Sequence, residues 1–195
     1  MEASSSLELQ VTVVSAAPDH LVFRYRARNT WTRDLYLFNR LFDTDPTGRR
    51  KVDPNRVYVM VEGSVLNASK QLFDVPETLE VEFPEVPYLT RLAPGAAFEE
   101  EIRLSLPARE TYPYASSRAQ RQPGEKRVCE QFVFTLGYFH AREASWVQPI
   151  QVDGQELLAT DYGFASQTRQ AVASPAQRVR TECLVLADPR RRTRG

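Results

Sequence analysis

The chain has 195 residues, enough for one full hydrophobic core, with 42% hydrophobic residues, 26% charged residues and a formal net charge of zero. This composition excludes a wholly disordered chain, and the balanced charge argues against broad attraction to nucleic acid or to an anionic membrane. Arginines cluster only at the end of the chain, at positions 190, 191, 192 and 194. We therefore expect one domain over residues 1–187, a basic disordered tail over 188–195, and neither a nucleic-acid nor a membrane partner.

The first ten residues, MEASSSLELQ, lack the cationic start and apolar run of a secretory signal, and no stretch of the sequence is apolar over transmembrane length. This predicts a cytoplasmic location. In a reducing compartment Cys129 and Cys183 are expected to be free thiols, and a disulfide between them would require their strands to pair. Two cysteines and the isolated His20 and His140 do not supply the ligands that zinc needs, so we expect no metal and no cofactor.

The first segments alternate with a period of two residues, which is typical of strands. Leu7–Val14 places apolar residues on one side. His20–Arg28 does the same and carries arginines on its other face, the pattern of an antiparallel sheet with one face in water. Asp34–Phe42 is apolar on both sides, so either both of its faces are covered or one face carries an exposed aromatic patch.

The middle of the chain contains shorter strand patterns separated by proline-rich or polar segments. Val57–Val61 predicts a strand. Val75–Pro94 contains four prolines, which confine pairing to edges, and we expect an edge strand at Leu79–Phe83 within it. Phe98–Leu106 predicts another strand. Ala108–Lys126 is the longest unpatterned stretch, and loops of this length are usually functional or disordered.

The most regular segment is Val128–Phe139. Phe132, Phe134, Leu136 and Tyr138 fall on one side of it, which predicts a central strand whose aromatic face is core. Two further strands are expected near the end of the chain, over 146–152 and 177–186.

These segments give about eight to ten short strands, typical of a β-sandwich or barrel. The order of the strands, the PG turn before FEEEIRLSLP and the aromatic-rich strand ending in LGY resemble an immunoglobulin-like or fibronectin-like sandwich. The LAPG turn before a charged alternating strand is similar to small bacterial intracellular proteinase-inhibitor sandwiches. The resemblance implies an all-β, antiparallel immunoglobulin-like β-sandwich with long loops.

Motifs for catalysis are missing from the sequence. There is no GxSxG elbow, HExxH, Walker loop or GxGxxG, and neither histidine has an acid or a nucleophile at a telling spacing. Residues 43–48 resemble the first half of a calcium loop, but Pro54 stands where a bidentate glutamate would be needed. We expect no enzymatic activity and no metal site.

Aromatic side chains outside the regular strands are the best candidates for binding. Trp31, Tyr112, Tyr114 and Trp146 lie in or beside loops, and such rings suit protein interfaces and sugar stacking alike. Their alternative role is to plug the ends of the sandwich. His140 ends the central strand at the same kind of rim, and it completes the set of candidate binding residues.

Together these observations predict a non-enzymatic protein-binding or adaptor domain of the bacterial cytosol. It would bind through an edge strand or the end loops, and a homodimer through an edge strand is one form of this prediction. The alternatives are a carbohydrate- or small-ligand-binding sandwich and an intracellular protease-inhibitor-like module.

Overall fold

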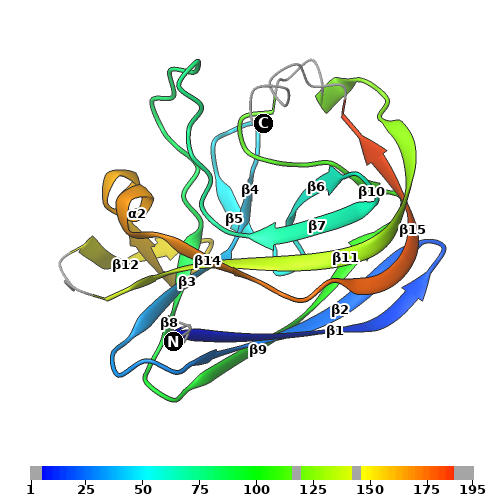
Figure 1. The fold of residues 1–195 in the computed structure, drawn as a ribbon. Helices are drawn as coiled ribbons and strands as arrows, with labels where there is room; N and C mark the ends of the chain where they lie inside the picture. The colour runs from blue at the N-terminus through cyan, green and yellow to red at the C-terminus, as the bar shows by residue number, and fades with distance from the viewer. Residues whose placement is uncertain (1–5, 116–119, 142–145, 187–195) are drawn as a thin grey trace.

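The computed structural model describes residues 6–115, 120–141 and 146–186. It confirms the all-β class: fifteen strands form a three-stranded sheet, a ten-stranded sheet and a two-stranded ribbon, and α2 (Tyr162–Thr168) is short (Figure 1). More strands are present than predicted because several have four residues or fewer, too short for a periodic pattern. These are β4 (Phe42–Thr44), β5 (Arg50–Val52), β10 (Ala108–Arg109) and β14 (Gln170–Ala173).

The three-stranded sheet consists of β1 (Leu7–Ala17), β2 (His20–Asn29) and β9 (Ala97–Ser105), all antiparallel. Its inner face is formed by the apolar side of β2, and its outer face is charged, with Arg24 bound to Glu101 at 2.9 Å. The expectation of a sheet with one face in water is confirmed.

Strand β11 (Glu125–His140) is the central strand of the large sheet, as predicted. Along one edge it pairs antiparallel with β15 (Gln177–Val185) and then β14. Along the other edge it pairs parallel with β7 (Val65–Lys70) and then antiparallel with β3 (Leu35–Arg40). Both edges of β11 are therefore hydrogen-bonded to neighbouring strands along most of its length.

A β-bulge between Cys129 and Gln131 sets which side chains of β11 face the core. Glu130 and Gln131 are both exposed, and both donate a backbone N–H to the carbonyl of Ser64, so the alternation of β11 is interrupted here. Cys129 therefore points into the same core as Phe132 and Phe134, although its position has the opposite parity. The predicted core face is confirmed, since Phe132, Phe134 and Leu136 are fully buried and Tyr138 is 4% exposed.

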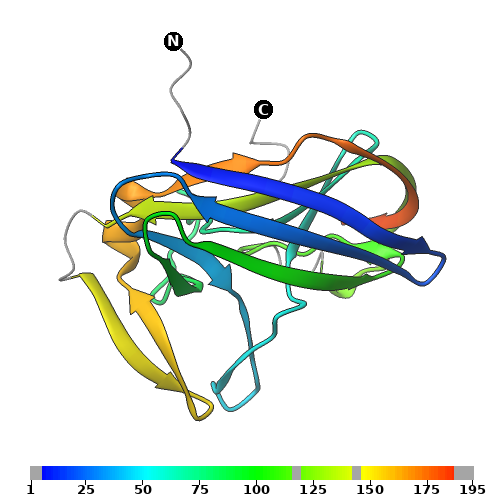
Figure 2. The ribbon, with the colours of Figure 1, turned by 90° about the horizontal axis from the view of Figure 1, so that it is seen from below.

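The two sheets pack face to face around this core. The ring of Phe23 on β2 lies 4.8 Å from that of Phe132 and 5.2 Å from that of Phe134. Figure 2 shows β1, β2 and β9 as one layer in front of the large sheet, and the hairpin of β12 (Val147–Val152) and β13 (Gln155–Thr160) extends away from it.

Strand β3 is covered on both faces, which decides between the two alternatives left by its sequence. Leu35 and Leu37 belong to the main core. Tyr36 and Phe38 face a second core around Phe139, where α2 packs.

The predicted edge strand at Leu79–Phe83 is wrong. The described strands on either side are β7 and β8 (Tyr88–Leu92), with irregular chain between them that rises above the sheets (Figure 1). Pro76, Pro84 and Pro87 remove backbone donors on both sides of this stretch, so a ladder does not form. Phe83 is 76% exposed as a result.

One ion pair lies between the two layers, inside the protein. The side chain of Lys70 on β7 is 0% exposed, and its Nζ donates to a carboxylate oxygen of Glu100 on β9 at 2.6 Å and to the carbonyl of Pro54 at 2.7 Å. Glu100 also accepts a hydrogen bond from the hydroxyl of Tyr25 at 2.9 Å. Burial lowers the pKa of the Lys70 ammonium, and the charge of Glu100 opposes part of that shift.

We expect Glu100→Gln to cost about 3 kcal/mol of stability, because it leaves the Lys70 charge buried without its counter-ion. Urea unfolding measures the loss. The matched control is Glu99→Gln, the neighbouring position, whose exposed carboxylate lies 3.7 Å from Arg24 and contributes at most about 1 kcal/mol. Equal costs for the two variants would contradict the buried ion pair.

The lowered pKa of Lys70 also predicts a pH dependence. Between that pKa and the value in the unfolded chain, about 10.4, the unfolded state binds more protons, so stability rises with pH in this window. We expect wild type to gain stability relative to Lys70→Met as the pH rises through this window toward about 10. Burial raises the pKa of Tyr25 and Tyr58, but both residues are present in both proteins, so the comparison isolates Lys70. A constant or falling difference would contradict it.

Candidate functional site

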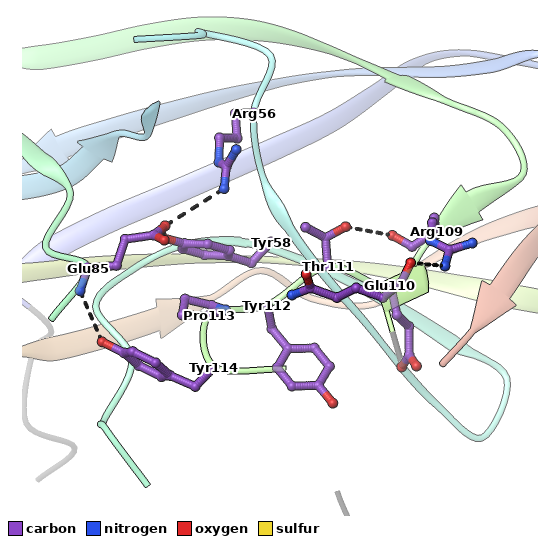
Figure 3. A pocket seen from close by; sticks show the side chains of 10 residues that line it. Arg56, Tyr58, Glu85, Arg109, Glu110, Thr111, Tyr112, Pro113 and Tyr114 are labelled. Atoms are coloured by element: carbon purple, nitrogen blue, oxygen red, sulfur yellow. Dashed lines mark hydrogen bonds and ion pairs between the residues drawn. The ribbon is translucent and has the colours of Figure 1, made fainter. Parts of the chain in front are cut away.

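A pocket of about 300 Å³ opens between β6 (Tyr58–Glu62), the loop after β10 and the irregular segment before β8 (Figure 3). Its lining combines three tyrosines with charged and polar side chains. The lining residues are Arg56, Tyr58, Glu85, Arg109, Glu110, Thr111, Tyr112, Pro113, Tyr114 and Gln120.

The loop on one side of the pocket turns sharply at Pro113 and Tyr114. The backbone N–H of Ala115 donates to the carbonyl of Tyr112 at 3.4 Å, and Tyr114 has a φ of 67°. Proline followed by a residue with positive φ is the pattern of a type II turn, in which the second position favours glycine. A tyrosine there costs about 1–3 kcal/mol of backbone strain, and such strain clusters at functional sites.

Two phenols hold Glu85 at the opposite wall. The hydroxyl of Tyr58 donates to the carboxylate of Glu85, and the backbone N–H of Glu85 donates to the hydroxyl of Tyr114 at 3.1 Å (Figure 3). Arg56 lies 3.8 Å from the same carboxylate. Burial raises the pKa of Tyr58, and the nearby charge of Glu85 raises it further. Burial also raises the pKa of Tyr114, although the backbone N–H of Glu85 opposes part of that shift, so both side chains are neutral phenols at physiological pH.

Glu110 fixes the base of the loop. Its two carboxylate oxygens accept hydrogen bonds from the backbone N–H groups of Val61 at 2.8 Å and Leu186 at 2.7 Å. Thr111 exchanges two backbone hydrogen bonds with Val59 at the same edge of β6. The loop therefore covers the edge of β6, and Glu110 joins that edge to the end of β15.

The charges around the pocket balance, with two arginines and two glutamates. Arg109 donates to the carbonyls of Gln120 and Gln122, both at 2.6 Å, and Arg56 also pairs with Asp43. A neutral, tyrosine-lined hollow of this size suits a side chain or a small group that is partly aromatic or apolar and carries a hydrogen-bonding end.

The structure separates the five predicted binding residues into three places. Tyr112 and Tyr114 line the pocket. Trp31 and His140 contact each other elsewhere, with ring centroids 4.3 Å apart, and Trp31 packs partly buried against the main core. Trp146 is 46% exposed and stacks on Phe164 at 5.7 Å. Of the described residues that line the pocket, none is a tryptophan or a histidine.

Sequence reasoning missed the other half of the pocket. Arg56 lies in the polar loop before the predicted strand Val57–Val61, and Tyr58 lies within that strand. Glu85 lies in the proline-rich segment Val75–Pro94, for which the sequence predicts an edge strand. The available signal was the prolines around Glu85, which mark irregular chain free to cross another element.

Other kinds of site receive no support from the described ranges. No helix there is long and apolar enough to cross a membrane, and no group of three or more His, Cys, Asp and Glu side chains is placed to hold a metal. In the loop that resembles half a calcium site, Asp45 accepts hydrogen bonds from Thr47 and from the N–H of Arg49, while Asp43 pairs with Arg56. The predicted tail at 188–195 lies outside the described residues.

No family model, curated protein or solved structure matches this chain. The interpretation of the pocket therefore depends on its geometry.

We expect Glu110→Ala to destabilise the protein by about 2–4 kcal/mol, because it leaves two buried backbone N–H groups without these acceptors. Urea unfolding tests this, with Glu62→Ala as the control. Glu62 ends the same strand β6 and is exposed, so its removal should change stability by less than about 0.5 kcal/mol. A Glu110 variant as stable as the Glu62 variant would show that the carboxylate does not hold the loop.

Proposed function

We propose that this chain is a non-enzymatic protein-binding domain that receives a segment of a partner protein at the tyrosine-lined pocket. The observation that carries the proposal is the strained Tyr114 turn, which holds a tyrosine in the lining of a neutral pocket at the cost of stability. The proposal keeps the bacterial cytosol, expected from the sequence, as the compartment.

The composition of this surface supports a protein partner. Tyrosine and arginine are, with tryptophan, the residues most enriched in binding hot spots, and the pocket has tyrosines and arginines. Phe83, two residues from Glu85 in the same segment, is 76% exposed and is the most exposed of the large hydrophobic side chains in the described ranges. An exposed phenylalanine close in sequence to the wall of a pocket suits an interface whose apolar centre has a polar rim.

The chemistry of the pocket supports binding rather than catalysis. Tyr58 and Tyr114 are held as neutral phenols, so they are poor bases, and the two carboxylates are engaged by hydrogen bonds or an ion pair. His20 lies at the start of β2 and His140 at the end of β11, beside Trp31. These arrangements favour a site that recognises a group without transforming it.

We also propose that the fold is a variant of the immunoglobulin-like sandwich. Its support is the face-to-face packing of two mainly antiparallel layers around one apolar core. The pairs β7 with β11 and β10 with β15 are parallel, and in this they depart from the antiparallel sheets of an immunoglobulin-like sandwich.

For a partner that binds by adding a strand to the edge of a sheet, β9 is the best candidate edge. It pairs only with β2 among the described strands, and at its other edge the N–H of Arg103 is bound by the side chain of Asn55 at 2.9 Å. Glu99 and Glu101 flank the open part of the edge, so an added strand would need basic residues opposite them. A homodimer through this edge stays a prediction, and one centred on either glutamate would place like charges together.

The pocket proposal is tested with Tyr114→Gly. Glycine adopts the positive φ without strain, so the turn is retained while the phenol is removed. The purified domain is used as bait in lysate of its native host, and the captured protein is then titrated against each variant. We expect Tyr114→Gly and Phe83→Ser each to weaken binding by about 2 kcal/mol, or roughly 30-fold in Kd.

Trp146→Ser is the matched control, since it removes an exposed aromatic ring that does not line the pocket. Circular dichroism establishes that each variant is folded. Equal affinity of wild type and the Tyr114 variant would refute the pocket, whatever the Phe83 variant does. Loss of binding in the Trp146 variant alone would move the site to the ring pair of Trp146 and Phe164.

A further inference from the structure

Two buried cysteines meet between β11 and β15. The Sγ atoms of Cys129 and Cys183 are 2.7 Å apart, not far beyond an S–S bond of about 2.05 Å, and both residues are 0% exposed. They are the chain's two cysteines, and both are free thiols in the structure.

The strand register accounts for the approach of the two sulfurs. Cys129 lies opposite Thr181, and Cys183 lies opposite Arg127, so the cysteines are diagonal neighbours across an antiparallel pair. The pairing is regular from Glu125 to Cys129, and both cysteines belong to the main core. Directly paired residues of a ladder share one face, as do residues two apart on a strand, so Cys129, Thr181 and Cys183 lie on the same side of the sheet.

The surroundings favour thiols over thiolates. Burial raises the pKa of Cys129 and of Cys183, so neither is a reactive nucleophile while the sheet is closed. Cys183 lies three residues before Leu186, near the end of β15, where strand ends open most readily. A soluble oxidant would thus reach the pair when this end opens, or before the sheet forms.

We propose that Cys129 and Cys183 are a redox pair that closes to an intramolecular disulfide under oxidising conditions. In the step, a thiolate of one cysteine attacks a low-molecular-weight disulfide and forms a mixed disulfide, releasing one thiol. The second cysteine, as thiolate, then attacks the protein sulfur and releases the other thiol. The two cysteines lose two electrons and two protons, and the oxidant is reduced to two thiols.

The disulfide would act next to the binding pocket. Cys183 pairs with Ala108 and Leu184 with Arg109 in the parallel contact of β10 and β15, and the loop that lines the pocket begins there. Glu110 then bonds to the N–H of Leu186. Joining β15 covalently to the central strand fixes the strand on which that loop rests, although the redox inference does not depend on the proposed function.

The test uses wild-type protein, first fully reduced and then incubated with oxidised glutathione. After unfolding in denaturant and alkylation, we expect an intact mass lower by two hydrogen atoms, no alkylated cysteine, and a proteolytic peptide joining Cys129 to Cys183. The oxidised form should melt roughly 5–15 °C above the reduced form.

Cys183→Ser is the control, and it should show neither the linked peptide nor the rise in Tm. If it does not fold, the comparison of reduced and oxidised wild type still decides the outcome. Two alkylated cysteines after complete exposure to the oxidant, glutathione adducts alone, or dimers joined between chains would each overturn the proposal. An intramolecular disulfide that formed without a rise in Tm would refute the inference that it stabilises the attachment of β15 to the central strand.

Discussion

The rest of the structure depends on the pairing of β11, which has hydrogen-bonded neighbours along both edges. A strand with one free edge can slip against its neighbour, but a shift of β11 by one residue would break four pairings and turn Phe132 and Phe134 away from the core. Gly137 strengthens the constraint, because a Cβ at this position would lie 2.7 Å from that of Gln71. The register of β11 thus positions the elements on both of its sides.

The position of the pocket follows from how the strands around β11 pair. On one side, β6 pairs with β7 and β7 pairs with β11; on the other, β10 pairs with β15 and β15 pairs with β11. Both walls of the pocket are therefore connected to the central strand β11 by strand pairing. Glu110 then joins them directly with hydrogen bonds to both sides. A binding surface made in this way is positioned by a rigid sheet although its lining residues lie on loops.

Regular features of the fold could be predicted from the sequence, and features that need long-range geometry could not. The alternation in β2 and β11 identified their buried faces, because burial on one face of a strand leaves a period of two. The bulge at Cys129 interrupts that period, and nothing in the local sequence required it. The parallel contact of β7 with β11 joins segments more than sixty residues apart, beyond the reach of any local pattern. For the same reason Tyr112 and Tyr114 could be chosen as candidates, whereas Glu85 and Arg56 are recognised only once the chain is folded.

The interior ion pair has a consequence for how this sequence can vary. Lys70 and Glu100 lie on different sheets, and the charge of Lys70 is tolerated inside the protein because Glu100 is present; Glu100 also lies 3.7 Å from Arg40. Replacement of Glu100 alone leaves the Lys70 charge buried without its counter-ion, and replacement of Lys70 alone leaves Glu100 with the weaker contact of Arg40 and the hydroxyl of Tyr25. Among homologous chains the two positions should therefore change together or not at all, and this coupling identifies sequences that share the arrangement of the two layers even where the loops around the pocket have diverged.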